Sequence, residues 1–208
     1  MTRLEEMLNE FCPDGVEYYY LDDLFDLRNG YTPSRNNESY WAGGTIPWFR
    51  MEDLRANGSI LSDSIEHITP SAIKGDLFEA DTIIMATSAT IGDHALIKVP
   101  YLSNQRFTNL APNSHFKNLL TPEFIYYYCF LLAEWARSNV NLSGFASVDM
   151  DRFRKFQFPI PPLPVQEEIV RILDTFTELE AELEARTKQY EHYRNQLLTF
   201  KPKTPHPL

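Results

Sequence analysis

The sequence predicts an α+β protein, in which a domain with a mixed or mostly antiparallel sheet precedes a long C-terminal coiled-coil helix. Over the first three-quarters of the chain, short apolar runs alternate with turn residues, as in the strands of such a sheet. After a proline-rich stretch, residues 165–200 contain no glycine or proline and repeat apolar residues at heptad spacing. We expect a domain over residues 1–160, an elbow and helix over 161–200, and a flexible tail over 201–208.

Residues 2–11 predict a short amphipathic helix. Thr2 and Glu5 have the spacing of a capping box, in which each side chain satisfies a free backbone N–H group of the first turn. Pro-Asp-Gly at residues 13–15 ends the helix. Its apolar residues recur on one stripe: Leu4, Met7, Leu8 and Phe11.

Strands and one buried helix fill the rest of the predicted domain. Thr121 caps the helix, Pro122 occupies its first position, and Glu123 places an acid in its first turn. The apolar run 124–133 indicates that this helix is buried on nearly all sides. A polar loop is expected over residues 28–44. Apolar and aromatic runs predict strands over residues 16–21, 45–49, 82–86, 95–99 and 156–160.

The long C-terminal helix carries a seam of apolar residues. With Ile169 as heptad position a, nine of the ten a and d positions over five heptads are apolar or aromatic, and Arg186 is the exception. We interpret the proline-rich residues 159–164 as a rigid elbow, with a proline-rich recognition ligand as the alternative. The expected dimer seam comprises Ile169, Ile172, Phe176, Leu179, Leu183, Tyr190, Tyr193 and Leu197.

The length of this helix points to a second chain. At about 1.5 Å per residue the helix is roughly 54 Å long, whereas a domain of about 160 residues has a radius of gyration of about 15 Å. The domain therefore cannot cover the outer half of the seam. Because this sequence has no second long heptad segment, we expect the partner helix to come from another chain. A long helix packed on its own domain is the alternative.

Composition and charge exclude several classes of protein. Lys and Arg number 19 against 29 Asp and Glu, a formal charge of −10, which argues against a non-specific nucleic-acid coat protein. It leaves open a protein that touches DNA with one small face. Two cysteines exclude a disulfide framework. With no signal peptide and no apolar run of membrane-spanning length, we expect a cytoplasmic chain with no membrane contact.

No catalytic or metal-binding pattern is visible in the sequence. Glycine-rich phosphate loops, zinc-ligand spacing and the Gly-x-Ser-x-Gly motif are absent, and the five histidines are scattered. The Asn-Pro-Pro-Tyr or Asp-Pro-Pro-Tyr tetrapeptide, with which adenine methyltransferases hold a flipped base, is also missing. We therefore expect no catalytic residue, no metal site and no cofactor in this chain.

Three polar segments flanked by aromatic residues are candidates for nucleic-acid binding. Arg and Asn side chains read guanine and adenine edges, while Ser, Thr and Tyr suit phosphate contacts. An ordinary polar loop with a few core aromatics, such as Trp48, is the alternative interpretation. The candidates are Arg28, Tyr31, Thr32, Ser34, Arg35, Asn36, Asn37 and Arg50 in the first segment, Gln105 and Arg106 in the second, and Ser143, Ser147 and Arg152 in or near the third.

Several of these stretches resemble the specificity subunit of type I restriction–modification systems. The Gly-Tyr-Thr-Pro-Ser sequence at 30–34 and the Tyr-Trp-Ala-Gly-Gly-Thr-Ile-Pro-Trp sequence at 40–48 are similar to signatures of that family. Residues 86–92 and 103–105 resemble its central motifs, and residues 159–170 resemble its domain-to-helix junction. The central motifs add Thr87 and Ser88 to the DNA-binding candidates.

The resemblance implies a DNA-recognition component without catalytic activity. The family's usual subunit has two target-recognition domains and two antiparallel helices that dock methyltransferase subunits, whereas this chain resembles one half of it. Two copies are then expected to pair antiparallel and to read a split palindromic site, with half-sites about one helical turn apart. The methyltransferase partner would bind S-adenosylmethionine, and a restriction-translocase subunit can join the complex.

Other functions remain open at this point. One is a non-catalytic acidic scaffold that dimerises through the helix, such as an inhibitor that mimics the charge of DNA. A mimic needs a dense array of acids, whereas the acids here are interspersed with Arg and aromatic residues. A fragment of a catalytic DNA enzyme is disfavoured by the missing motifs. A silent cassette or a truncated longer gene would carry the same sequence signals.

Overall fold

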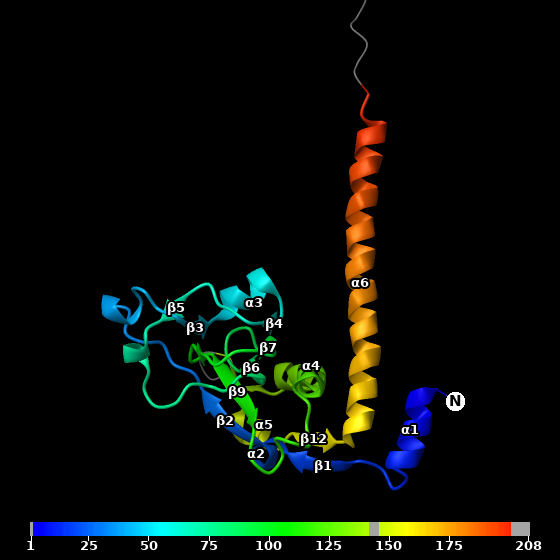
Figure 1. Cartoon of the computed structure of the whole chain (residues 1–208), viewed down its shortest axis with the longest axis horizontal. Helices are drawn as coiled ribbons and strands as arrows, with labels where there is room; N and C mark the ends of the chain where they lie inside the picture. Colours follow the sequence, from blue (N-terminus) through cyan, green and yellow to red (C-terminus); the bar gives the residue numbers. More distant parts are fainter. Residues whose placement is uncertain (1, 142–145, 201–208) are drawn as a thin grey trace, which may run out of the picture. The chain divides into compact units, whose positions relative to one another are not determined.

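The computed structural model describes residues 2–141 and 146–200. The chain divides into two compact units, Met1–Ile169 and Val170–Leu208, which we call unit one and unit two. The expected mixed α+β fold is confirmed, and the long helix α6 (Leu163–Leu198) begins within unit one (Figure 1). None of the helices in the described part combines the length and apolar character needed to cross a lipid bilayer.

A five-stranded mixed sheet forms the centre of unit one. Its strand order is β2-β9-β6-β7-β4, antiparallel except for the parallel β4–β7 pair at one edge. Strands β6 and β7 are buried along their whole length, as expected for the middle of a covered sheet. The strands are β2 (Phe25–Asn29), β4 (Ile60–Leu61), β6 (Thr82–Ala86), β7 (His94–Ile97) and β9 (Phe107–Pro112).

Smaller sheets surround this centre. Strand β3 joins β5 and β8 in a three-stranded sheet, and β10 pairs with β11. Strand β1 pairs antiparallel with β12, which brings the two ends of unit one together. These strands are β1 (Glu17–Tyr20), β3 (Ile46–Phe49), β5 (His67–Ile68), β8 (Leu102–Ser103), β10 (Val140–Asn141), β11 (Ser147–Val148) and β12 (Gln157–Ile160).

The helices begin where the sequence signals place them. Thr2 and Glu5 form the expected capping box of α1 (Arg3–Phe11). Thr121 caps α4 (Pro122–Ser138), which packs on β6 and β7 and buries seven of its residues, although Phe130 and Leu131 remain exposed. The shorter helices are α2 (Leu21–Leu24), η1 (Glu38–Tyr40), α3 (Met51–Asn57), η2 (Pro70–Ala72) and α5 (Met150–Phe153).

A buried polar residue ties the first turn of α6 to unit one. The Gln166 side chain is fully buried, and its Nε2 donates to the carbonyl oxygens of Leu119 and Pro161, both at 2.7 Å. Its Oε1 accepts from the backbone N–H of Thr121 at 2.9 Å. Because each bond is desolvated and satisfied, the elbow holds the first turn of α6 in a fixed position within unit one.

Candidate nucleic-acid interface

One end of the central sheet gathers four loop segments that are far apart in the sequence. Because the strands are antiparallel, β2 and β6 end where β9 begins. Backbone bonds then join the segments: Gly30 N–H to the Phe107 carbonyl at 3.2 Å, Thr87 N–H to the Arg106 carbonyl at 3.0 Å, and Val148 N–H to the Thr87 carbonyl at 2.8 Å. We call this surface the loop edge; it comprises residues 29–34, 87–90, 103–106 and 146–149.

Gly30 explains how closely the first two segments of the loop edge approach. A Cβ atom at this position would lie 2.1 Å from the carbonyl oxygen of Ser103 and 2.4 Å from its Oγ. Any other residue would push the two loops apart. Ser103 is fully buried, and its hydroxyl has no hydrogen-bond partner among the described residues.

The third segment of the loop edge carries a strained residue. Ala89 has a φ of +66°, a left-handed conformation that costs a residue with a Cβ roughly 1–2 kcal/mol. Ser88 bridges to Ser147, and the Ala89 N–H donates to the carbonyl of Ala146 at 3.3 Å. These contacts with the fourth segment hold the unfavourable conformation in place.

Five of the sequence-predicted residues meet at the loop edge with accessible side chains. The Thr32 hydroxyl donates to Oε1 of Gln105 at 2.7 Å, which links the first and second segments. Arg106 is exposed beside Gln105, while Ser88 and Ser147 are partly exposed. Together they offer hydroxyl, amide and guanidinium groups, the chemistry that reads base edges and holds phosphates.

Thr87 lies beneath this surface. Its side chain is buried, and its hydroxyl lies 2.9 Å from that of Thr108, which in turn donates to Oδ1 of Asn29 at 2.8 Å. The chain of bonds connects the ends of β6, β9 and β2. Thr87 therefore positions the loop edge.

Other predicted residues make contacts within the chain, near the small sheet. Arg35 lies over the ring of Trp41 at 3.7 Å and pairs with Glu66 at 2.6 Å. Arg50 pairs with the same carboxylate at 2.8 Å. The Tyr31 hydroxyl donates to the carbonyl of Ala72 at 3.2 Å. These contacts fix the loop before β3, as the alternative interpretation of an ordinary polar loop would have it.

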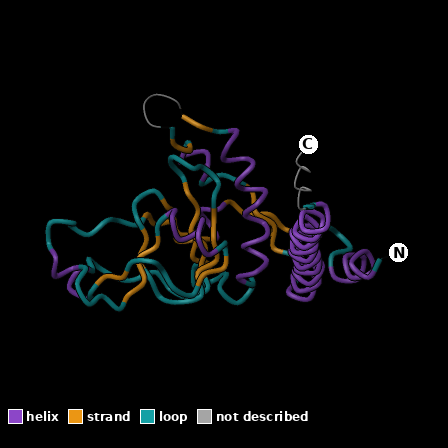
Figure 2. The backbone as a smooth tube through the Cα atoms, turned by 90° about the horizontal axis from the view of Figure 1, so that it is seen from above, coloured by secondary structure: helices purple, strands orange, loops and turns teal. Residues whose placement is uncertain are grey.

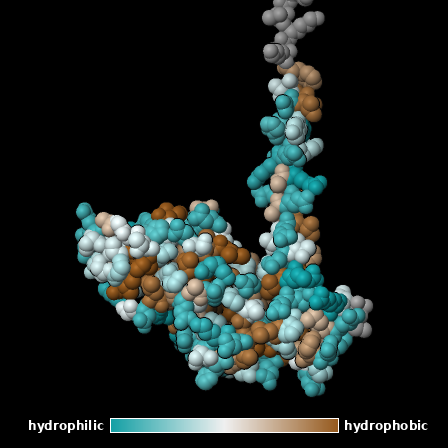
Figure 3. Space-filling view, viewed as in Figure 1, coloured by the Kyte–Doolittle hydropathy of each residue, from teal (hydrophilic) through white to brown (hydrophobic). Residues whose placement is uncertain are grey.

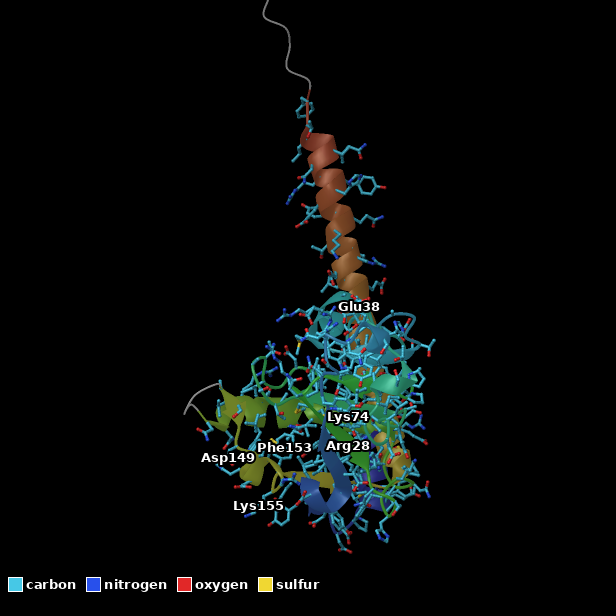
Figure 4. All side chains as sticks on the ribbon, turned by 90° about the vertical axis from the view of Figure 1, so that its left-hand side faces the viewer. Arg28, Glu38, Lys74, Asp149, Phe153 and Lys155 are labelled. Carbon is cyan, nitrogen blue, oxygen red and sulfur yellow. The ribbon has the colours of Figure 1, made fainter. Side chains whose placement is uncertain are left out.

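The remaining predicted residues are spread over unit one. Asn37 caps η1, and Ser34 and Asn36 are exposed in the turn before it. Arg28 donates to the carbonyl of Asp76 at 3.0 Å and lies apart from Asp149 and Lys155 (Figure 4). Ser143 lies outside the described residues.

Arg152 belongs to a second surface, which sequence reasoning did not find. It lines a hollow with Lys155 and with aromatic residues of α4 and the β1–β12 pair. Two of these aromatics, Tyr18 and Tyr20, are 56% and 48% exposed. No local pattern announces the hollow, because β1 and β12 meet only through long-range pairing.

Catalytic chemistry is not visible in this arrangement. Within residues 2–141 and 146–200 there is no group of three or more side chains suited to a metal ion. His94 is buried between the rings of Tyr126 and Phe130, and its Nδ1 lies 3.0 Å from the Gly92 carbonyl oxygen. Burial lowers the pKa of this imidazole, which favours a neutral, structural histidine.

The seam of α6 is exposed within the single chain. Ile169 and Ile172 are half-buried, and the six predicted seam residues from Phe176 to Leu197 are between 52% and 73% exposed. Figure 3 shows apolar residues at the surface of α6, with a group at its C-terminal end. Arg186 pairs at 2.6 Å with Glu182 of its own helix, where the sequence had suggested an acidic partner from another helix.

Comparison with known proteins identifies the family. Residues 13–190 match the family described as type I restriction modification DNA specificity domain. The specificity subunit of the type I restriction enzyme EcoprrI from Escherichia coli is 52% identical over 206 residues, with 90% of this chain and 51% of that subunit covered. That of EcoR124I/EcoR124II, also from Escherichia coli, is 33% identical over 217 residues, with 96% and 52% covered. The chain spans about half the length of these curated relatives.

Solved structures agree on the fold. A chain from a study of complex assembly and conformational transition in a type I R-M system superposes with a TM-score of 0.69 at 18% identity, over 93% of this chain and 48% of that one. The HsdS subunit from Thermoanaerobacter tengcongensis gives 0.64 at 17% identity, over 88% and 44%. The curated relatives are specificity subunits, which confirms the expectation of a specificity component in place of a catalytic one. The chain belongs to the family of type I restriction–modification DNA specificity domains.

Proposed function

We propose that this chain reads one half of a split DNA site and that the loop edge is its reading surface. The convergence of Thr32, Ser88, Gln105, Arg106 and Ser147 at one end of the sheet supports the proposal most directly. A rigid sheet with loops joined by backbone bonds can hold such side chains in one arrangement. The proposal also rests on membership of the family.

The charge of the chain assigns phosphate binding largely to a partner. With a net charge of −10, the chain alone binds DNA weakly and with strong dependence on salt. We propose that a methyltransferase subunit, which binds S-adenosylmethionine, clamps the DNA backbone and carries out the reaction. A restriction subunit joins the same complex where one is present.

We further propose that two copies pair through α6 in antiparallel orientation. The exposed seam calls for an apolar partner, and the charges select the orientation. Residues 163–184 carry seven acids and one arginine, a net charge of −6, whereas residues 185–200 carry three basic residues and one acid, a net charge of +2. Antiparallel pairing places each acidic half against a basic half, while parallel pairing places like against like.

A single antiparallel register pairs all five heptads. In antiparallel coiled coils, an a residue of one helix meets a d residue of the other. A one-heptad shift would leave seam residues without partners at the helix ends. The resulting layers are Ile169 with Phe200, Ile172 with Leu197, Phe176 with Tyr193, Leu179 with Tyr190, and Leu183 with Arg186.

Arg186 fits the central layer of this register. Its aliphatic stem can lie on the Leu183 of the second copy while its guanidinium stays with Glu182 of its own helix. A single polar position in a seam favours one register over others. The dimer would have a true two-fold axis and present two identical loop edges, so its split site should be palindromic.

A genome-wide map of adenine methylation tests this function. Cells that lack other systems would express the chain together with its neighbouring methyltransferase subunit, and the control would omit the chain. A new split, palindromic motif is the expected result. A split but asymmetric motif would replace the homodimer with a pair of different half-subunits. A stable complex that methylates no motif would contradict DNA reading and favour the silent cassette or the scaffold.

A further inference from the structure

The N-terminal helix α1 carries an apolar stripe that unit one leaves partly uncovered. Leu4, Met7, Leu8 and Phe11 share one face, yet no residue of α1 is buried, and Phe11 is 43% exposed. The capping box holds the helix by itself, with the Glu5 N–H 3.2 Å from Oγ1 of Thr2 and the Thr2 N–H 2.7 Å from Oε2 of Glu5. A surface helix normally turns its apolar stripe into a core. This stripe is therefore available to a partner.

The position of α1 limits the choice of partner. Arg3 lies 3.7 Å from Glu168 in the first turns of α6, and Figures 1 and 2 show α1 beside those turns. The pairing of Glu17 with Ile160 explains this placement, since it brings the chain after α1 and the chain before α6 to the same end of the β1–β12 ribbon. The seam begins at Ile169, the residue after Glu168. Whatever covers the start of the seam therefore arrives next to α1.

In the proposed register, the C-terminal end of α6 from the second copy arrives there. Phe200 and Leu197 of that copy pair with Ile169 and Ile172. This end of α6 is more apolar than a two-helix seam requires, because Leu198, 67% exposed, stands at heptad position b, outside the seam. A third apolar surface is needed to cover it.

We propose that the apolar stripe of α1 packs against the C-terminal end of α6 from a second copy of the chain, so that each end of the helix pair contains three helices. Charge supports this occupant: residues 3–11 have a net charge of −2 and residues 185–200 a net charge of +2. The inference rests on the proposed helix pairing but adds an interface that pairing alone does not require. It gives the N-terminal helix a role in assembly.

Dimer dissociation constants test the proposal. Leu4→Ser/Leu8→Ser removes the stripe, and Glu6→Asp/Glu10→Asp is the matched control, with two conservative changes elsewhere on the helix. Two copies of the contact are lost per dimer, so the first variant should dimerise at least roughly thirtyfold more weakly, while the control should stay within about threefold of the unchanged chain. Thermal unfolding of unit one should not change appreciably, because α1 buries none of its residues.

Each outcome distinguishes this inference from the helix pairing. An unchanged chain that stays monomeric at every concentration would refute the pairing, and the α1 contact with it. A dimer whose dissociation constant is insensitive to Leu4→Ser/Leu8→Ser would overturn the α1 contact alone. If that variant instead lost binding to the methyltransferase subunit, the stripe would belong to that protein, and the proposal would again be overturned.

Cross-linking gives a second, independent measurement. One copy carries Met7→Cys and the other Leu198→Cys, both in a Cys12→Ser background, since Cys129 is buried. A short bismaleimide should join the two copies. Replacing Leu198→Cys with Lys188→Cys, near the middle of α6, should abolish the product. Equal yields from positions 188 and 198, or no product from position 198 in a stable dimer, would contradict the proposal.

Discussion

Replacement of Leu183 by aspartate should separate the proposed dimer without unfolding either unit. Leu183 is 66% exposed in the single chain, so this substitution removes few contacts within it. In the proposed register it lies in the layer nearest the two-fold axis, against the stem of Arg186 of the other copy. Aspartate would place a carboxylate where the leucine side chain should be covered.

The magnitude follows from the exposed fraction. Full burial of a leucine contributes about 1.5–3 kcal/mol, so covering the exposed two-thirds of Leu183 contributes about 1–2 kcal/mol per copy. Two copies per dimer give about 2–4 kcal/mol, or roughly 30- to 1000-fold in the dissociation constant. Desolvation of the new charge adds to this loss.

Sedimentation equilibrium over a range of concentrations measures the effect. Ala185→Asp is the matched control, because it introduces the same charge two residues away at heptad position c, outside the seam. Circular dichroism should show the helix and unit one intact in both variants. An equal dissociation constant for Leu183→Asp and the unchanged chain would refute the seam as the interface, and equal weakening by both aspartates would reduce the effect to general repulsion.

Four further predictions test orientation, packing, pH dependence and DNA reading. When Leu179→Cys and Tyr190→Cys chains, both in a Cys12→Ser background, are mixed under oxidising conditions, antiparallel pairing should yield a 179–190 disulfide. Parallel pairing would place these positions about 16 Å apart and favour 179–179 disulfides. Gly30→Ala should lower the free energy of unfolding by at least about 2 kcal/mol, because its Cβ meets backbone, whereas Gly43→Ala, with no atom within 4 Å, should cost only about 1 kcal/mol; equal losses in denaturant titrations would contradict the role of close approach. Because burial lowers the pKa of His94, the unfolded chain binds its proton more readily, so stability should be full above about pH 6.5 and fall below it; His94→Gln should reduce that slope, and an unchanged slope would assign it to other groups. Arg106→Ala, expressed with the methyltransferase, should weaken binding to the methylated site by about 1–3 kcal/mol and relax one base if it reads an edge, or weaken all sequences alike if it holds phosphate.

Local signals predicted the helices and the seam well, because their causes lie within a few residues. The capping box of Thr2 and Glu5 and the cap at Thr121 are confirmed as drawn from the sequence. The start of α6 after the prolines follows from the backbone restrictions of proline itself. These features need no knowledge of the rest of the chain.

The composition of the loop edge is set by long-range pairing and was beyond such signals. Gln105 is a neighbour of Thr32 only because β2, β6 and β9 end together, 73 residues apart in the case of this pair. The same polar composition also describes Arg35 and Arg50, whose contacts with Glu66 depend on the path of the loop before β5. Residue type indicated the chemistry, whereas topology determined which residues share a surface.

The division of charge along α6 connects the recognition surface to the way its specificity can change. A helix with a net charge of −6 in one half and +2 in the other is complementary to itself only when reversed, so its best partner is a second copy. In the proposed dimer both loop edges come from one sequence. A substitution at Gln105 or Arg106 would therefore alter both halves of the recognised site at once and keep it palindromic. A relative with two recognition domains in one chain would change only one half. The methylation motif of an Arg106 variant thus reports on the symmetry of the assembly as well as on the reading residue, and a motif altered in one half only would be incompatible with two identical chains.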